Sequence, residues 1–177
     1  YVRLRLSSTG NLDVTGLAED GEVEDYPVLL SPAVDLVFDF STADNVVTLL
    51  DNGIAGDGIS RLTSTSPIET IDFTNPSGSL TLTVGDGDDS VIVVSLDSLF
   101  EATLTIDGGN GSDLLDAMAA EVAATLNGGS GDDILLGSPG NDRLDGGQGN
   151  DSLAGHAGDD FFNARTGNDT LLGGPGN

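Results

Sequence analysis

A nine-residue unit recurs through the last third of the chain and restricts its fold more than any other feature. Residues 128–172 divide into five consecutive nonamers, GGSGDDILL, GSPGNDRLD, GGQGNDSLA, GHAGDDFFN and ARTGNDTLL. The fourth residue is always Gly, the fifth is Asp or Asn, and the sixth is always Asp. The eighth is always large and apolar: Leu135, Leu144, Leu153, Phe162 and Leu171. A unit this short cannot bury its own core, so the pattern predicts a solenoid whose rungs cover one another.

The spacing of the units predicts how the rungs stack. Each nonamer supplies a Gly-rich turn and a short strand with one inward side chain, so two nonamers complete one circuit. Units two apart then lie directly above each other. This stacking places Asp133, Asp151 and Asp169 in one column, and Asp142 with Asp160 in a second column at the opposite edge. We therefore expect an all-β fold, a parallel β-roll or β-solenoid with Gly- and Asp-rich turns.

The chain is strongly acidic, with 30 Asp and Glu against 5 Lys and Arg and a formal net charge of −25. Carboxylates stacked one rung apart, roughly 4.8 Å, repel each other unless a cation lies between them. The glycines bend each turn so that carbonyl oxygens point inward. Together with two stacked carboxylates they supply roughly six to eight oxygen ligands, the number that calcium prefers. We predict several Ca²⁺ ions as the folding ligand, without which Asp repulsion and the ordering cost of the glycines leave the repeats expanded.

Residues 128–177 resemble the RTX nonapeptide repeats, G-G-x-G-x-D-x-U-x. The resemblance implies a calcium-loaded parallel β-roll, in a chain that stays unfolded in the calcium-poor cytosol and folds after crossing an envelope. The chain departs from the motif at the second position with Ser138, His156 and Arg165, and at the first with Ala164. We expect backbone strain in these turns and the weakest calcium site in the turn 164–169.

The repeat continues upstream in a looser form. Residues 108–116, GGNGSDLLD, fit the nonamer well, and residues 84–92, VGDGDDSVI, fit it partly. Aligning these segments places Asp89 and Asp113 in the same column as Asp133. The intervening segment 117–127 has no Asp and no Gly but keeps an inward Leu126. We therefore expect a rung there that has lost the metal turn at one edge.

The predicted calcium-binding residues are the Asp at the sixth position and Gly at the second and fourth positions of the turns. They are Asp89, Gly109, Gly111, Asp113, Gly129, Gly131, Asp133, Gly140, Asp142, Gly147, Gly149, Asp151, Gly158, Asp160, Gly167 and Asp169. The simpler alternative is that these acidic residues only solvate the turns, in which Asp and Asn are common. An EF-hand is excluded, since the DGDD string at 86–89 is not followed by Glu at the required loop position.

The composition shifts along the chain predict three parts. Residues 108–177 form the RTX-type calcium-binding β-roll. Residues 31–107 carry β-rich runs at irregular spacing, which are either longer solenoid rungs or a small separate β unit. Residues 1–30 are similar to the C-terminal end of a GEVED domain, with the eponymous string at 21–25. Because only the end of that module is present, we expect the chain to be part of a longer polypeptide.

Several functions are disfavoured by composition. Nucleic acid is not an expected partner because no basic patch can be assembled. The sequence contains no run of about 18 apolar residues, so it predicts no membrane-spanning helix. The chain has no Cys, a single imidazole at His156, and no Ser that the repeat would bring together with His and Asp. We therefore predict no catalytic residues.

The sequence predicts a calcium-dependent structural or adhesive segment of a secreted, extracellular or cell-surface protein, without enzymatic activity. One alternative is a passive RTX secretion and folding tail of an enzyme elsewhere in the parent chain. Another is a β-helical polysaccharide-acting enzyme, for which Arg61, Arg143 and Arg165 are the basic candidates.

Two further partners stay open. An open solenoid edge invites self-association. A row of outward threonines on successive rungs would form a flat face for carbohydrate or ice, although threonine is first of all a good strand former. The row consists of Thr81, Thr83, Thr103, Thr105 and Thr125.

Overall fold

The structure is a computed structural model that describes residues 3–7, 35–40, 44–65 and 68–176. The GEVED-like string at 21–25 lies outside the described residues. Every regular element within them is a β-strand, so the predicted all-β class is confirmed. The strands are β1 (Arg3–Ser7), β2 (Asp35–Asp39), β3 (Val46–Asp51), β4 (Ile59–Thr65), β5 (Ile68–Thr74), β6 (Ser79–Asp86), β7 (Ser90–Val93), β8 (Thr103–Asn110), β9 (Leu114–Asp116), β10 (Ala124–Ser130), β11 (Ile134–Leu136), β12 (Arg143–Gln148), β13 (Ser152–Ala154), β14 (Phe161–Asn163) and β15 (Thr170–Leu172).

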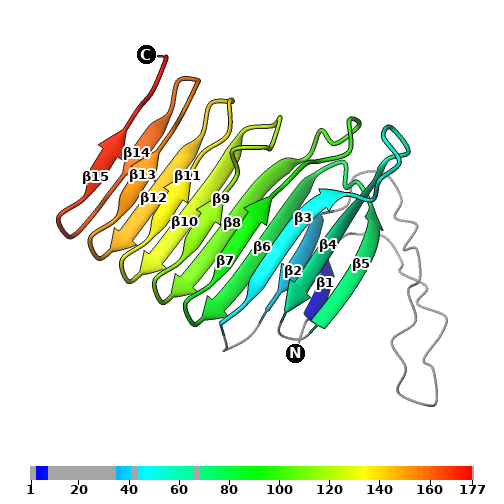
Figure 1. The fold of residues 1–177 in the computed structure, drawn as a ribbon, viewed down its shortest axis with the longest axis horizontal. Coiled ribbons are helices and arrows are strands. Elements are labelled where there is room, and N and C mark those ends of the chain that lie inside the picture. Colours follow the sequence, from blue (N-terminus) through cyan, green and yellow to red (C-terminus); the bar gives the residue numbers. More distant parts are fainter. Residues whose placement is uncertain (1–2, 8–34, 41–43, 66–67, 177) are drawn as a thin grey trace.

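The strands form two sheets that face each other across the core (Figure 1). Sheet A has the order β1-β2-β6-β8-β10-β12-β14, and sheet B has the order β15-β13-β11-β9-β7-β3-β4-β5. From β6 and β7 onward the chain alternates between the sheets, one strand in each, and all strand pairs are parallel. One rung is therefore one strand of sheet A, a turn, and one strand of sheet B.

The register confirms that nonamers two apart lie directly above each other. Leu135 of β11 pairs with Leu153 of β13, and Leu144 of β12 pairs with Phe162 of β14. Leu135, Leu144 and Leu153 are fully buried. The eighth residue of the repeat is thus the inward side chain, and each rung covers the equivalent side chain of its neighbour.

The N-terminal end of the solenoid is built differently. Strands β3, β4 and β5 pair antiparallel and extend sheet B, while β2 and β3 join the parallel stack through β6 and β7. Phe38 of β2 and Phe73 of β5 lie with ring centroids 5.3 Å apart in the core. The strands within 35–93 thus belong to the same two sheets as the repeats, and the boundary at residue 107 stays a prediction.

The segment 117–127 makes a turn that is filled with methyl groups. Ala117 and Ala120 are fully buried, and the Ala120 N–H donates to the Ala117 carbonyl at 2.9 Å. Leu126 is fully buried, as its expected inward orientation requires. Apolar side chains therefore occupy this turn, where the next rung has Gly137, Gly140 and Asp142.

The outward threonines are stacked only in part. Thr81 pairs with Thr105, which pairs with Thr125, so these three form one column on sheet A. Thr83 instead pairs with Asp107, and Thr103 pairs with Ser79. The five threonines therefore do not form one flat threonine face. Only a single column of three is continuous, and the two others pair with Asp107 and Ser79.

Candidate metal sites in the turns

The first turn edge, between each sheet A strand and the following sheet B strand, carries a ladder of Asp side chains. The backbone N–H of each sixth-position residue donates to Oδ1 of the equivalent Asp on the next rung. The N to Oδ1 distances are 2.6 Å for Asn45 to Asp89, 2.9 Å for Asp89 to Asp113, 2.9 Å for Asp113 to Asp133, 3.0 Å for Asp133 to Asp151 and 2.9 Å for Asp151 to Asp169. The predicted column of Asp89, Asp113 and Asp133 therefore exists, with Asn45 at its start.

The second oxygen of these carboxylates has no protein partner. Oδ2 accepts no hydrogen bond in Asp89, Asp113, Asp133 or Asp151. Each of these residues is at most 2% exposed, so the protein buries the oxygen without giving it a partner. The pKa of Asp113 is raised to about 6 and that of Asp133 to about 7, chiefly by burial and in smaller part by the neighbouring carboxylates. A buried, unpaired carboxylate oxygen is costly, so these atoms are suited to a cation.

Backbone oxygens converge on the same spaces. A β-carbon placed on Gly108 would meet both Asp113 Oδ2 and the carbonyl oxygen of Gly128 on the next rung. A β-carbon placed on Gly128 would meet Asp133 Oδ2 and the carbonyl oxygen of Gly146. Glycine at the first position therefore keeps open a space that oxygens from two successive rungs surround.

The other predicted glycines shape the turns through their backbone conformation. Gly109, at the second position, has φ of 104°, and Gly111, at the fourth, has φ of 135°. Such angles favour glycine because it lacks a β-carbon. The same region of φ is adopted by Gly129, Gly131, Gly147, Gly149, Gly158 and Gly167.

A second ladder on the outside of the turns was missed by sequence reasoning. At the fifth position, Asp132 Oδ1 accepts the Asn150 N–H at 2.7 Å, and Asn150 Oδ1 accepts the Asn168 N–H at 3.0 Å. This ladder runs opposite to the Asp ladder, since each N–H donates back to the preceding rung. The invariant Asp or Asn at the fifth position was the available signal, and its role here is to hold successive turns together.

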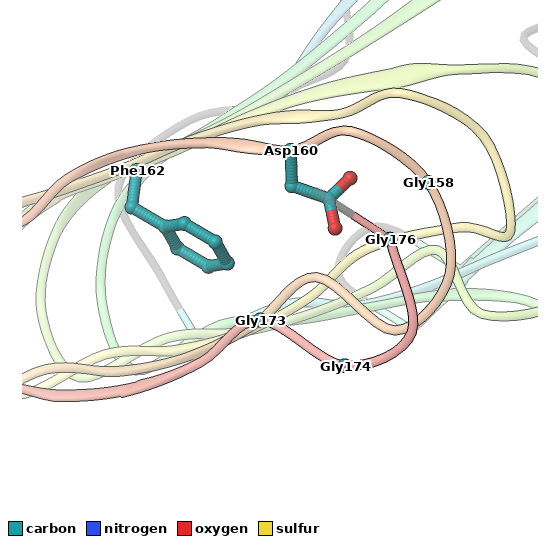
Figure 2. Close-up of a pocket in the computed structure, with 6 residues that line it drawn as sticks. All are labelled: Gly158, Asp160, Phe162, Gly173, Gly174 and Gly176. Atoms are coloured by element: carbon teal, nitrogen blue, oxygen red, sulfur yellow. The ribbon is translucent and has the colours of Figure 1, made fainter.

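The opposite turn edge carries the second predicted column. Asp142 N–H donates to Asp160 Oδ1 at 3.0 Å, and Asp160 Oδ2 is buried without a hydrogen-bond partner. Figure 2 shows the Asp160 carboxylate and the Phe162 ring directed into one small pocket. Glycine backbone forms the rest of the pocket wall: Gly158, Gly173, Gly174 and Gly176.

The turn that contains Asp142 has different contacts. The Ser138 N–H donates to Asp142 Oδ2 at 2.6 Å, and the Ser138 hydroxyl donates to Oδ1 at 2.8 Å. The Ala124 N–H also donates to Oδ1, at 2.7 Å. Both carboxylate oxygens of Asp142 therefore have protein partners, and Gly140 of this turn is not among the glycines with positive φ.

The turn that contains Asp89 is also distinct. Val84 lies opposite Gly108, between the pairs Thr83–Asp107 and Gly85–Gly109, and it is fully buried. A side chain therefore stands at the first position of this turn, where Gly108 leaves open space. Burial raises the pKa of Asp89, and the hydrogen bonds from Asn45 lower it.

Expected strain is found at two of the unusual second positions. His156 has φ of 70° and Arg165 has φ of 56°, and among the described residues they are the non-glycine residues with positive φ. Ser138 is not among them, so strain was wrongly expected there. Arg165 is held by two hydrogen bonds of 2.6 Å to Asp145, which lower the pKa of that carboxyl.

Among the described residues, no group of three His, Cys, Asp or Glu side chains converges to hold a metal. The turns offer single carboxylates beside backbone carbonyl oxygens instead. These are hard oxygen ligands of the kind that calcium takes, so the residues present fit the ion. Within the same described part, no helix is long and apolar enough to cross a membrane.

Comparison with known proteins identifies the repeat. The sequence model of a protein family described as the RTX calcium-binding nonapeptide repeat, in 4 copies, matches residues 105–119, 123–153 and 145–177. No curated protein and no solved structure matches the chain. The matched residues cover most of β8, strands β9 to β15 and the Gly- and Asp-rich turns from 108–113 onward, whereas the turn with Asp89 lies outside them. Such repeats bind several Ca²⁺ ions. Residues 105–119 and 123–177 of this chain are therefore similar in sequence to the RTX calcium-binding nonapeptide repeats.

Proposed function

We propose that calcium held between successive turns folds this solenoid, and that the solenoid is a structural or adhesive segment of a secreted or cell-surface protein. The buried Oδ2 atoms of Asp113, Asp133 and Asp151, which have no protein partner, support this most directly. The carbonyl oxygens of Gly128 and Gly146 lie beside two of them. These residues would hold ions on the first edge, and Asp160, whose buried Oδ2 also has no protein partner, would hold one on the second. The glycines at the second and fourth positions shape the turns.

Calcium acts on folding through charge and linkage. A net charge of −25 opposes a compact state, and divalent ions between the turns offset the repulsion where it is greatest. Each site that binds only the folded chain adds about 2.7 kcal/mol of stability at a hundredfold excess of calcium over its dissociation constant. Several such sites together make folding depend on a calcium-rich environment, which favours an extracellular location.

The contacts of the arginines favour a structural role over an enzymatic one. Arg143 lies over the Phe161 ring, 4.7 Å from its centroid, and Arg165 pairs with Asp145. Arg61 pairs with Asp72 on the outside of sheet B. Each arginine that the enzyme alternative would need is thus engaged in a contact with a side chain of its own or a neighbouring rung.

The test compares Asp133→Asn with Asp132→Asn, because both substitutions remove one charge from the same turn. We expect the β signal in circular dichroism to increase at the expense of coil as the repeats fold on calcium addition, and the change to revert with chelator. Isothermal titration should show that D133N binds about one ion fewer, because Asp133 supplies an inward ligand. D132N should keep the wild-type number, since its Oδ1 acceptor remains and faces outward.

A wild-type chain that neither binds calcium nor changes its spectrum would contradict the proposed function. Deleting residues 108–177 from the protein as its host expresses it separates the adhesive role from the alternative of a passive secretion tail. Loss of secretion alone, with attachment unchanged in the protein that is released, would favour the tail.

A further inference from the structure

The turn 137–142 on the second edge has the Asp of a calcium turn but not its open oxygen. We propose that Ser138 closes this turn in place of a calcium ion, so that the turn is permanently metal-free. The inference rests on the proposed calcium function of the other turns, and it identifies a turn that the ions do not occupy.

The carboxylate of Asp142 is satisfied by hydrogen-bond donors. It accepts the N–H and the hydroxyl of Ser138 and the N–H of Ala124, at distances from 2.6 to 2.8 Å. Ser138 is fully buried, and its hydroxyl in turn accepts the Gly140 N–H at 2.9 Å. A donor aimed at Oδ2 brings partial positive charge to the place where a cation would otherwise lie, so it opposes metal binding.

The turn one rung later gives a direct comparison on the same edge. Asp160 accepts the Asp142 N–H through Oδ1, yet its Oδ2 has no hydrogen-bond partner. The second-position residue of this turn, His156, has φ of 70°, in the region that the second-position glycines of other turns adopt. The motif Asp is therefore present in both turns, and the second-position residue separates them.

Pro139 explains why Ser138 differs from His156. The ring of a proline disfavours helical conformations of the preceding residue and moves it toward extended ones. Ser138 accordingly does not adopt the positive φ of the other second positions, and its N–H points toward Asp142. Gly174 also precedes a proline, but it has no β-carbon and keeps φ of 88°.

The neighbouring rung completes the closure. The turn beneath, within 117–127, has no Asp, and its one carboxylate belongs to the exposed Glu121. Ala117 and Ala120 fill this turn. On the other side, a β-carbon placed on Gly137 would meet Asp142 Oδ2 and the carbonyl oxygen of Gly155, as in the calcium turns. The N–H of Ser138 that is directed at Oδ2 is therefore what distinguishes this turn. On this edge the first turn that would hold calcium is therefore the one that contains Asp160. The turn 137–142, which Ser138 closes by hydrogen bonds, precedes it without an ion.

The experiment counts bound calcium by equilibrium dialysis and native mass spectrometry for wild type, Asp142→Asn and Asp160→Asn. We expect D160N to bind about one ion fewer and D142N to bind the wild-type number. D142N should still lower the free energy of unfolding in saturating calcium, because the hydrogen bonds that it loses do not involve an ion. A D142N protein that loses one ion would overturn the inference.

A second variant, Ser138→Gly, keeps the test decisive should D142N fold poorly. Glycine restores the motif and can take the positive φ that Gly174 adopts before its proline. We expect S138G to gain about one ion, and an unchanged number would overturn the role of Ser138. D133N serves as the reference for the function itself, since its loss of one ion tests calcium binding at a turn that the inference does not involve.

Discussion

At the scale of single residues, Asp97 shows a buried carboxylate with a purely structural role. It accepts hydrogen bonds from the N–H groups of Gly56 at 2.6 Å, Gly58 at 3.2 Å and Leu99 at 2.9 Å, and from Asn75 Nδ2 at 3.1 Å. Burial raises its pKa, but these hydrogen bonds outweigh burial and hold the pKa below the usual value. One side chain thereby ties the loop between β3 and β4 to two other turns.

Asp97→Asn should lower the free energy of unfolding by about 2 to 3 kcal/mol, because an amide replaces one acceptor by a donor that faces other donors. Since the folded-state pKa is depressed, the stabilisation by Asp97 is full at neutral pH. It is lost as the pH falls below about 4 and through the folded pKa. Urea unfolding at pH 7 and pH 3 measures both effects. Glu101→Gln, an exposed change nearby, should have little effect, and equal losses in the two variants would contradict this role.

At the scale of the strands, the side chain at the eighth repeat position contributes differently to stability in different rungs. Leu135 of β11 is fully buried between neighbouring rungs, whereas Leu171 of β15 is 48% exposed at the end of sheet B. Both are the inward residue of their nonamer. Stability at this position therefore comes from the rung that covers the side chain and not from the unit itself.

Leu135→Ala should cost about 3 kcal/mol, the usual loss for removing a fully buried leucine side chain. Leu171→Ala should cost less than about 1 kcal/mol, because water already reaches much of that side chain. Denaturant unfolding in saturating calcium measures the pair. Similar losses at both positions would show that the units are stable separately.

Period and residue type predicted the strands of the repeats well, because one inward leucine and one turn recur at fixed spacing. They did not predict the antiparallel strands β4 and β5, whose alternation resembles that of the parallel rungs. Asn45 was missed as the first member of the Asp column because no glycines mark its turn. Ser138 was expected to strain its turn, and its hydrogen bonds to Asp142 were missed, since the spacing of a motif does not show which way an N–H points.

At the scale of the whole molecule, the apolar core becomes thinner from the N-terminal end to the C-terminal end. Strand β2 buries Leu36 and Phe38, and β6 buries Leu80, Leu82 and Val84. The strands from β11 to β13 each bury a single leucine: Leu135, Leu144 and Leu153. Hydrophobic burial therefore holds the first rungs, and the later rungs depend more on the ions proposed between their turns.

This gradient predicts that removing calcium unfolds the molecule unevenly. In chelator, amide hydrogen exchange should accelerate strongly in strands β10 to β15, where each strand contributes little apolar surface. Strands β2 to β7 should keep most of their protection, because the core around Phe38 and Phe73 does not involve the ions. Exchange measured by mass spectrometry with and without calcium resolves the two regions. Equal loss of protection along the whole chain would mean that the rungs unfold as one unit, and that calcium supports the phenylalanine core as strongly as it supports the turns.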